Sequence, residues 1–197
     1  MKSKKPKSKK ESNFKPEINN LWLKGGILIA GLIFAFYFQT FQFDFVNWDD
    51  QVNLYENENV VNFDVKGIFT DHVIGNYNPL SNFTMAVEYL LVKESPGLYH
   101  FNNVLLHIIC SLLVYLLMKR LGLSFFVSFL AAILFGIHPM RVESVAWVTE
   151  RKDVLFGVFY LLSLLLYISY YRTKKAAYFI LSVLVFILSL LSKIQAV

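Results

Sequence analysis

The residues best suited to chemistry lie in three short polar segments of an otherwise apolar chain, and the first segment contains the adjacent acids Asp49 and Asp50. A carboxylate in such a pair can accept the proton of a hydroxyl group as a general base, or it can bind a cation. Ordinary solvated loop acids are the alternative interpretation, and the pair alone leaves the choice open. A calcium-binding loop is not expected, because Leu54 and Val60 stand where an EF-hand has glycine and glutamate.

The second segment places His100, Asn103 and His107 on one face of a helix, because three and four residues separate them. His107 lies well inside an apolar run, where polar groups face the bundle interior and form hydrogen bonds or serve a function. Hydrogen bonding between helices and a supporting role in a site are both compatible with this pattern. Two histidines without a carboxylate at a suitable spacing do not indicate a metal site, so we expect no divalent metal.

The third segment, residues 138–153, carries seven ionisable side chains among its 16 residues: His138, Arg141, Glu143, Glu150, Arg151, Lys152 and Asp153. A simple connection between two helices needs no such density of charge. Arg141, Arg151 and Lys152 of this segment can bind phosphate oxygens, and Lys193 adds a fourth cation. The alternatives are that the segment only anchors the chain at the membrane interface and that Lys193 only extends its ammonium group to that interface by snorkelling. The spacing of Glu143, Trp147 and Glu150 also predicts that these three residues share one helical face, with Arg151 beside them.

The elements that must position these segments are membrane-spanning helices. Of the 197 residues, 56% are apolar and only 17% are charged, against about 25% charged in globular proteins, which excludes an ordinary soluble domain. Uncharged apolar stretches occupy residues 25–43, 98–118, 121–137, 154–171 and 176–192. About 20 helical residues cross a hydrocarbon core of roughly 30 Å. We therefore predict an all-α, multi-pass transmembrane helical bundle with five spans. The single cysteine, Cys110, excludes an internal disulfide and a cysteine-built metal site.

The distribution of charge predicts how the bundle is oriented. Eight lysines and two glutamates lie in residues 1–24. Further cations follow the second and fourth spans, namely Lys119, Arg120, Arg172, Lys174 and Lys175. The positive-inside rule makes that side cytoplasmic and puts the N-terminus inside. Residues 44–97 fall on the other side and hold nine acids and two lysines, a balance of −7.

The chain divides into a basic cytoplasmic tail, residues 1–20, and a membrane domain, residues 21–197. The tail is expected to lie near anionic lipid. A nucleic-acid-binding role is not expected, because no nucleic-acid-binding motif accompanies its lysines. In the outer loop, residues 44–97, Asn78 and Pro79 suit the start of a helix whose side chains Leu80, Phe83, Val87 and Leu90 form one apolar stripe. Such a helix suits the membrane surface. A second short helix is expected near Val65 and Ile68, and residues 138–153 form a second outer segment.

Together these segments resemble the membrane-embedded glycosyltransferases of the GT-C superfamily. The closest resemblance is to the transmembrane and tetratricopeptide-repeat-containing O-mannosyltransferases and their bacterial relatives. The matching segments are VNWDDQVNLYENENV, YNPLSNFTMAVEYL, YHFNNVLLH, FGIHPMRVESVAWVTERKDVL and LLSKIQAV, which run from Val46 to the last residue. Acidic pairs are common, but residues 138–153 in this order with the other segments are specific.

The resemblance implies transfer of a sugar from a polyprenyl-phosphate donor to an acceptor hydroxyl of a protein or glycan on the outer or luminal side, with mannose as the sugar expected from the family. It implies that Asp49 or Asp50 is the catalytic base, and we favour Asp50. We expect an inverting reaction without a cofactor, in which the donor phosphate contacts Arg141, Arg151, Lys152 and Lys193. The expected supporting residues are His100, Asn103, His107, His138, Glu143 and Asp153.

Two departures from the family pattern shape the remaining expectations. Asn78 stands where eukaryotic members typically have a basic residue, which points to the bacterial branch and a bacterial cytoplasmic membrane, with the endoplasmic reticulum membrane as the alternative. The chain stops after its fifth apolar stretch without a 34-residue repeat, so we expect an N-terminal fragment. The competing hypothesis is a catalytically inactive fragment or a non-enzymatic structural or transport protein of the membrane.

Overall fold

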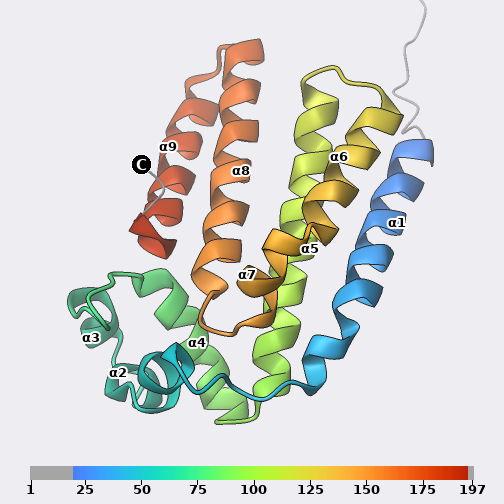
Figure 1. The fold of residues 1–197 in the computed structure, drawn as a ribbon. Coiled ribbons are helices and arrows are strands. Elements are labelled where there is room, and N and C mark those ends of the chain that lie inside the picture. The colour runs from blue at the N-terminus through green and yellow to red at the C-terminus, as the bar shows by residue number, and fades with distance from the viewer. Residues whose placement is uncertain (1–19, 195–197) are drawn as a thin grey trace, which may run out of the picture.

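The computed structural model describes residues 20–194, which form helices joined by short connections (Figure 1). The predicted basic tail therefore lies almost wholly outside the described residues. The longer helices are α1 (Asn20–Tyr37), α4 (Pro79–Val92), α5 (Pro96–Arg120), α6 (Phe125–Ile137), α8 (Arg151–Thr173) and α9 (Ala176–Ser192). The shorter ones are α2 (Glu58–Val61), α3 (Val65–Thr70), α7 (Val142–Ala146), a π-helical turn (Gln51–Tyr55) and 3-10 turns (Phe38–Gln42, Pro139–Arg141). Within this range no strand is formed beyond an isolated bridge between Val73 and Asn76.

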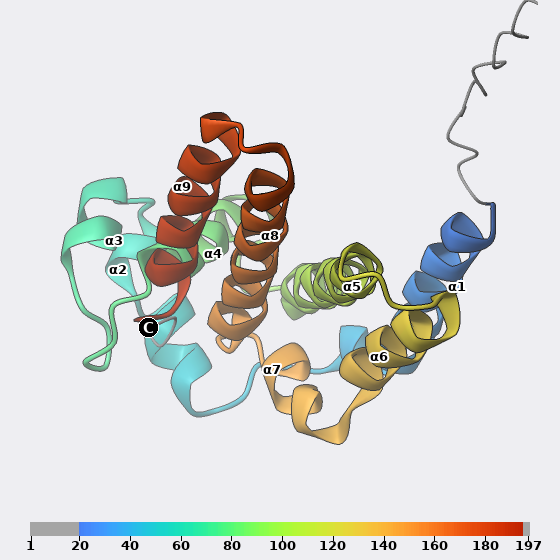
Figure 2. The same ribbon diagram turned by 90° about the horizontal axis from the view of Figure 1, so that it is seen from above.

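Helix α5 is the centre of the bundle. Seen from above, it lies between the pair α1 and α6 and the pair α8 and α9 (Figure 2). An apolar core that includes Ile33, Val104, Ala132 and Val154 joins α1, α5, α6 and α8. The predicted all-α helical bundle is confirmed.

The two ends of the bundle differ in charge. The end that carries α2, α3, α4 and α7 lies at the bottom of Figure 1 and holds the described acids, and we call it the acidic end. The opposite end carries Lys24, Lys119, Arg120, Arg172, Lys174 and Lys175, and we call it the basic end. This separation agrees with the charge pattern of the sequence, while the sidedness in a membrane remains a prediction.

Within the described residues, three helices are long and apolar enough to cross a membrane: Asn20–Gln42, Pro96–Arg120 and Arg151–Thr173. A fourth crossing results if α6 and the segment Pro139–Ala146, which is bent from it by 53°, count as one span. Helix α9 has 17 residues and rises only about 25 Å. The protein is thus a membrane protein by the length and composition of its helices, and the number of five crossings stays a prediction.

The prediction of a continuous 17-residue third span is wrong. Its helix begins only at Phe125, because Gly122 has a left-handed backbone with φ of 89° and the Ser124 hydroxyl accepts a hydrogen bond from the Val127 amide. The remaining 13 residues of α6 rise about 20 Å, less than a hydrocarbon core of roughly 30 Å. The break after α6 brings the charged segment 138–153 into the bundle.

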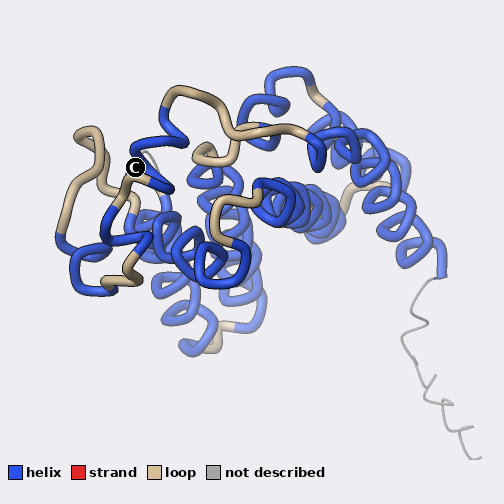
Figure 3. The backbone as a smooth tube through the Cα atoms, turned by 90° about the horizontal axis from the view of Figure 1, so that it is seen from below, coloured by secondary structure: helices blue, strands red, loops and turns tan. Residues whose placement is uncertain are grey.

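Residues 44–97, which we call the outer segment, fold around an apolar core of their own at the acidic end. Leu54, Val60, Ile68 and Met85 are buried there against Val148 of the connection between α7 and α8. Figure 3 shows the short helices and loops of this segment gathered on one side of the bundle. The predicted helices near residues 65 and 79 are confirmed as α3 and α4.

Helix α4 carries its polar side chains inward. Asn82 and Glu88 are buried against the rest of the protein. Of the predicted stripe, Val87 and Leu90 are exposed, whereas Phe83 packs against the apolar core formed by Leu54, Val60 and their neighbours. The exposed half of the stripe is compatible with a membrane surface. The helix begins at Pro79 as predicted, but the Asn78 side chain forms no capping hydrogen bond.

The predicted common helical face of Glu143, Trp147 and Glu150 is also wrong. Helix α7 ends at Ala146, and the backbone of Trp147 is extended, with φ of −87° and ψ of 124°. Asn103 donates hydrogen bonds to two carbonyl oxygens of the segment that follows, at 3.0 and 3.2 Å. These contacts from another helix replace the hydrogen bonds that would continue α7.

Three helices approach closely at Gly136 of α6. A Cβ atom there would collide with Ile33 and lie 3.1 Å from the Ser111 hydroxyl oxygen. We predict that Gly136→Ala lowers the free energy of unfolding by about 1–3 kcal/mol, because the packed side chains cannot all move aside. Thermal unfolding of the detergent-solubilised protein measures the effect.

Gly31→Ala is the matched control, since a Cβ atom at Gly31 of α1 meets nothing within 4 Å. We expect this variant to unfold at or slightly above the temperature of the unchanged protein. Equal unfolding temperatures for the two variants would contradict the close approach.

Candidate functional site

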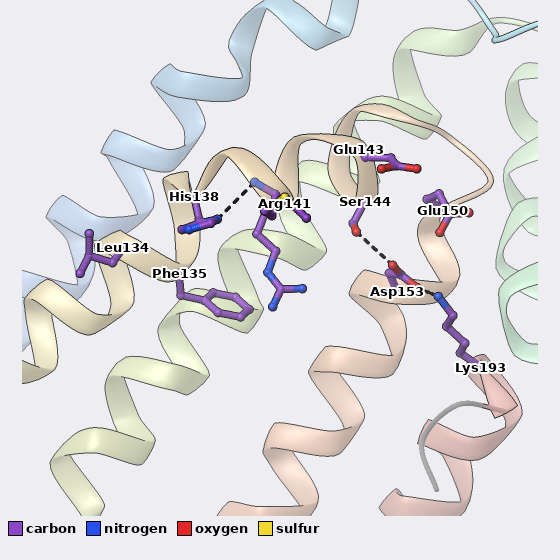
Figure 4. A pocket seen from close by; sticks show the side chains of 10 residues that line it. Leu134, Phe135, His138, Arg141, Glu143, Ser144, Glu150, Asp153 and Lys193 are labelled. Carbon is purple, nitrogen blue, oxygen red and sulfur yellow. Dashed lines mark hydrogen bonds and ion pairs between the residues drawn. The ribbon is translucent and has the colours of Figure 1, made fainter.

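A pocket of about 740 Å³ opens at the acidic end between α6, α7, α8 and the end of α9, and we call it the outer pocket (Figure 4). Its lining includes five predicted site residues: His138, Arg141, Glu143, Asp153 and Lys193. Leu134, Phe135, Met140, Ser144 and Glu150 complete the lining, and the sequence analysis assigned no site role to these. The pocket therefore brings together charged groups from segments that lie far apart in the sequence.

A second cavity of about 360 Å³ adjoins the outer pocket and shares Arg141, Asp153 and Lys193 with it. Its other walls are largely apolar and include Phe156 and Leu161 of α8. A polar mouth thus continues into an apolar space between the helices. Such a shape suits a ligand with a charged head and an apolar tail.

Arg141 is the cation of the outer pocket that forms no ion pair with another described residue. Its guanidinium carbon lies 4.8 Å from the centre of the Phe135 ring, and the side chain is exposed. Stacking on an aromatic ring leaves the N–H donors of a guanidinium available for an anion. The His138 ring accepts a hydrogen bond from the Met140 amide at 3.2 Å, which fixes the turn that carries Arg141.

Lys193 enters the pocket from the end of α9 and forms an ion pair with Asp153. The other oxygen of Asp153 accepts a hydrogen bond from the Ser144 hydroxyl at 3.0 Å (Figure 4). Asp153 therefore joins α7, α8 and the end of α9 at the floor of the pocket.

Arg151 does not line the outer pocket. Its side chain is 1% exposed and forms an ion pair with Glu88 of α4, whose side chain is 8% exposed. The guanidinium also donates to the Asn103 side chain at 2.8 Å and to the Tyr99 carbonyl oxygen at 2.9 Å. We call Glu88, Tyr99, Asn102, Asn103 and Arg151 the Arg151 network.

The Arg151 network connects α4 and α5, which are neighbours in the sequence, with α8, which begins about 30 residues after α5 ends. Asn102 donates to the same Glu88 oxygen that receives the guanidinium, at 2.8 Å, while Asn103 binds the segment after α7. Burial raises the pKa of the Glu88 carboxyl, and the Arg151 guanidinium beside it opposes that shift. Glu88 was missed by the sequence analysis, although an acid on an otherwise apolar helix that lies off the apolar stripe is a usable sign of a buried partner.

Asp50 joins the outer segment to the connection between α7 and α8. Its carboxylate is fully buried and accepts hydrogen bonds from the Val46 amide at 2.8 Å and the Thr149 amide at 3.0 Å. Asp49 is half-buried, and its carboxylate forms no hydrogen bond with another described residue. Neither acid lines the outer pocket.

Several buried polar atoms near Asp50 lack a hydrogen-bond partner within residues 20–194. They include both ring nitrogens of His100, the Trp147 indole nitrogen and the Thr149 hydroxyl. Each such atom costs about 1–3 kcal/mol when left unpaired in a protein interior.

The remaining predicted residues have structural contacts, and His107 also lines the second cavity. The His107 ring donates from Nε2 to the Gly136 carbonyl oxygen at 2.8 Å, which satisfies an acceptor at the end of α6. Lys152 forms an ion pair with Glu150 at 2.6 Å and does not line either cavity. Among the described residues no three His, Cys, Asp or Glu side chains are grouped as in a metal site, and the expectation of a metal-independent reaction stays a prediction.

We predict that Arg151→Met lowers the free energy of unfolding by about 3–5 kcal/mol, because it leaves the Glu88 carboxylate buried without its partner. The neighbouring Lys152→Met is the matched control, and its more exposed pair with Glu150 is expected to contribute no more than about 1 kcal/mol. Thermal unfolding of the two variants in the same detergent checks this difference. Similar losses in both variants would contradict the structural role of Arg151.

Comparison with known proteins finds related sequences, including three protein O-mannosyl-transferases. The chain is 30% identical over 166 residues to the human protein O-mannosyl-transferase TMTC3, which covers 79% of this chain and 18% of the relative. It is 37% identical over 123 residues to the Caenorhabditis elegans protein O-mannosyl-transferase F38B6.6, covering 61% and 17% of the two chains. The Xenopus laevis protein O-mannosyl-transferase tmtc2 is 37% identical over 99 residues, covering 50% of this chain and 12% of the relative.

The chain thus spans less than a fifth of the length of these curated relatives. No family model and no solved structure matches. The relatives come from animals and give no support to a bacterial cytoplasmic membrane. The sequence relation predicted from the ordered motifs is confirmed: the chain is a homologue of the TMTC protein O-mannosyl-transferases.

Proposed function

We propose that the chain is the part of a membrane glycosyltransferase that holds a polyprenyl-phosphate sugar and transfers its sugar to an acceptor hydroxyl at the acidic end. The names of the relatives, protein O-mannosyl-transferases, support mannose as the sugar and a protein as the acceptor. The observation that carries the proposal is the outer pocket, whose charged mouth continues into an apolar cavity between the helices. A lipid-linked sugar phosphate has the same division into a charged head and an apolar tail.

Arg141 and Lys193 are the proposed contacts of the donor phosphate. Both line the outer pocket and the adjoining cavity, so they lie where the head of the lipid would meet its tail. Asp153 holds Lys193 in place, and the stacking of Arg141 on Phe135 leaves its donors free for phosphate oxygens. Arg151 and Lys152 were included in the sequence prediction, but their ion pairs with Glu88 and Glu150 support a positioning role instead.

The proposed base is one of the adjacent acids, and the geometry favours Asp49 over Asp50. The carboxylate of Asp50 already accepts two backbone hydrogen bonds and is fully buried, whereas that of Asp49 is partly accessible. Asp50 then acts as a positioning residue that holds the outer segment against the connection between α7 and α8. The π-helical turn Gln51–Tyr55 follows these acids directly, and such turns are frequent at functional sites.

In the proposed reaction the Asp49 carboxylate takes the proton of the acceptor hydroxyl. The acceptor oxygen then attacks the anomeric carbon of the sugar from the face opposite the phosphate. The bond between that carbon and the phosphate oxygen breaks, and the phosphate leaves with the electron pair. General base catalysis contributes roughly 10²–10⁴-fold. Fixed cations beside the leaving oxygen stabilise the charge that develops there.

The membrane in which this happens is part of the proposal. The animal origin of the relatives supports the membrane of the endoplasmic reticulum, the alternative from the sequence analysis, with the acidic end on the luminal side. A non-enzymatic membrane protein is the second candidate, and two observations favour it: Asp50 is buried, and neither acid belongs to the lining of the outer pocket. Variants of Arg141, Asp49 and Asp50 distinguish the glycosyltransferase from the non-enzymatic protein.

We predict that Arg141→Ala lowers sugar transfer by about 10²–10³-fold, since it removes a donor from the departing phosphate. Transfer of radiolabelled mannose from a polyprenyl-phosphate donor to membrane proteins, with the protein expressed from its complete gene, is the measurement. Lys152→Ala is the matched control, because it removes a nearby cation that does not line the pocket. Equal losses in both variants would contradict this use of the pocket.

Asp49→Asn and Asp50→Asn should fail in different ways. We predict that Asp49→Asn keeps the unfolding temperature and loses about 10²–10⁴-fold in transfer rate. Asp50→Asn places an amide group against one of the two backbone N–H donors and should lose about 1–3 kcal/mol of stability as well. Full transfer by Asp49→Asn would overturn the assignment of the base, and full transfer by both variants would favour the non-enzymatic candidate.

A further inference from the structure

An apolar groove lies between α1 and α5 at the basic end, away from the outer pocket. Its volume is about 450 Å³. Trp22, Gly26 and Ala30 recur every four residues along α1 and form one wall, and Tyr115 and Lys119 belong to the opposite wall on α5. From Trp22 to Ala30 the groove follows α1 for about 12 Å.

Small residues on α1 make the groove. A Cβ atom at Gly26 would lie 3.7 Å from the Leu112 side chain, an ordinary contact distance, so a side chain is tolerated there. Ala30 continues this floor one turn further into the bundle. A larger side chain at Gly26 would take up part of the groove that Gly26 and Leu112 both line.

The mouth of the groove is a fixed aromatic and cationic site. The Lys119 ammonium lies 4.5 Å from the centre of the Trp22 ring. The Tyr115 hydroxyl donates a hydrogen bond to the Trp22 carbonyl oxygen at 3.2 Å, and the Phe125 ring meets the indole edge-on at 5.5 Å. Lys119 is exposed and forms no ion pair with another described residue.

The charge around the mouth has one sign. The charged residues of the basic end within the described range are all bases: Lys24, Lys119, Arg120, Arg172, Lys174 and Lys175. Because no described acid competes for them there, an anion from the surroundings is the natural partner of Lys119. A tryptophan at the end of a membrane helix is typical of the level of lipid head groups.

We infer that this groove binds one acyl chain of an anionic phospholipid, whose phosphate pairs with Lys119. The apolar walls hold the chain, Trp22 lies beside the glycerol region, and the ammonium of Lys119 selects for negative charge. The inference is independent of the proposed glycosyl transfer, because it uses the other end of the bundle and none of the residues of the outer pocket.

Native mass spectrometry of the detergent-solubilised protein, loaded with equal amounts of phosphatidylglycerol and phosphatidylcholine, tests the site. We expect about fivefold preferential retention of phosphatidylglycerol, and we expect Lys119→Met to abolish the preference. Lys174→Met is the matched control, since its ammonium also lies over an aromatic ring, 4.3 Å from the centre of Tyr171, without lining the groove. This control should keep the preference.

Gly26→Leu tests the acyl chain separately from the head group. We expect this variant to reduce retention of both lipids. Gly31→Leu is the matched control and should leave retention unchanged, because a Cβ atom added at Gly31 meets nothing within 4 Å. Equal retention of the two lipids by the unchanged protein, or an undiminished preference in Lys119→Met, would overturn the inference. Self-association that is lost in Gly26→Leu without any change in lipid retention would assign the groove to a second copy of the chain and would equally overturn it.

Discussion

The burial of the Arg151 guanidinium is the constraint on which the arrangement of the acidic end depends. A permanent charge removed from water is stable only when it is paired and hydrogen-bonded, and here each of the three guanidinium nitrogens donates to a partner: Glu88, Asn103 or the Tyr99 carbonyl oxygen. These partners come from α4 and α5, while Arg151 begins α8. One side chain thereby fixes the outer segment, the central helix and the start of α8 relative to one another.

The outer pocket follows from that arrangement. Asp153 lies two residues after Arg151 on the first turn of α8, so the position of its ion pair with Lys193 depends on where the Arg151 network holds that turn. The break after α6 places Arg141 in the same pocket as this ion pair. Asp50 holds the connection between α7 and α8 by accepting a hydrogen bond from the Thr149 amide. Function in this account requires charged groups held rigidly at the edge of an apolar bundle, and the network supplies that rigidity.

The sequence predicted the elements whose formation depends on the length of an apolar run. Helices α5, α8 and α9 begin and end within a few residues of the predicted stretches. The prediction failed where one residue's backbone or a distant contact decides the structure, as at Gly122 before α6 and at Trp147 after α7. Arg141 and Lys193, which the sequence analysis assigned to one site, both line the outer pocket. The pairing of Arg151 with Glu88, 63 residues earlier, leaves no spacing that a sequence pattern could reveal.

A double-mutant cycle between Glu88→Gln and Arg151→Met tests the central claim most directly, with the free energy of unfolding measured for both single variants and the double variant. The account predicts that the losses are far from additive, with a coupling energy of about 3 kcal/mol, because each single variant leaves a buried group without its partner. Additive losses would contradict it, since they would show that the two side chains stabilise the protein independently and that the outer segment is held by its apolar core alone.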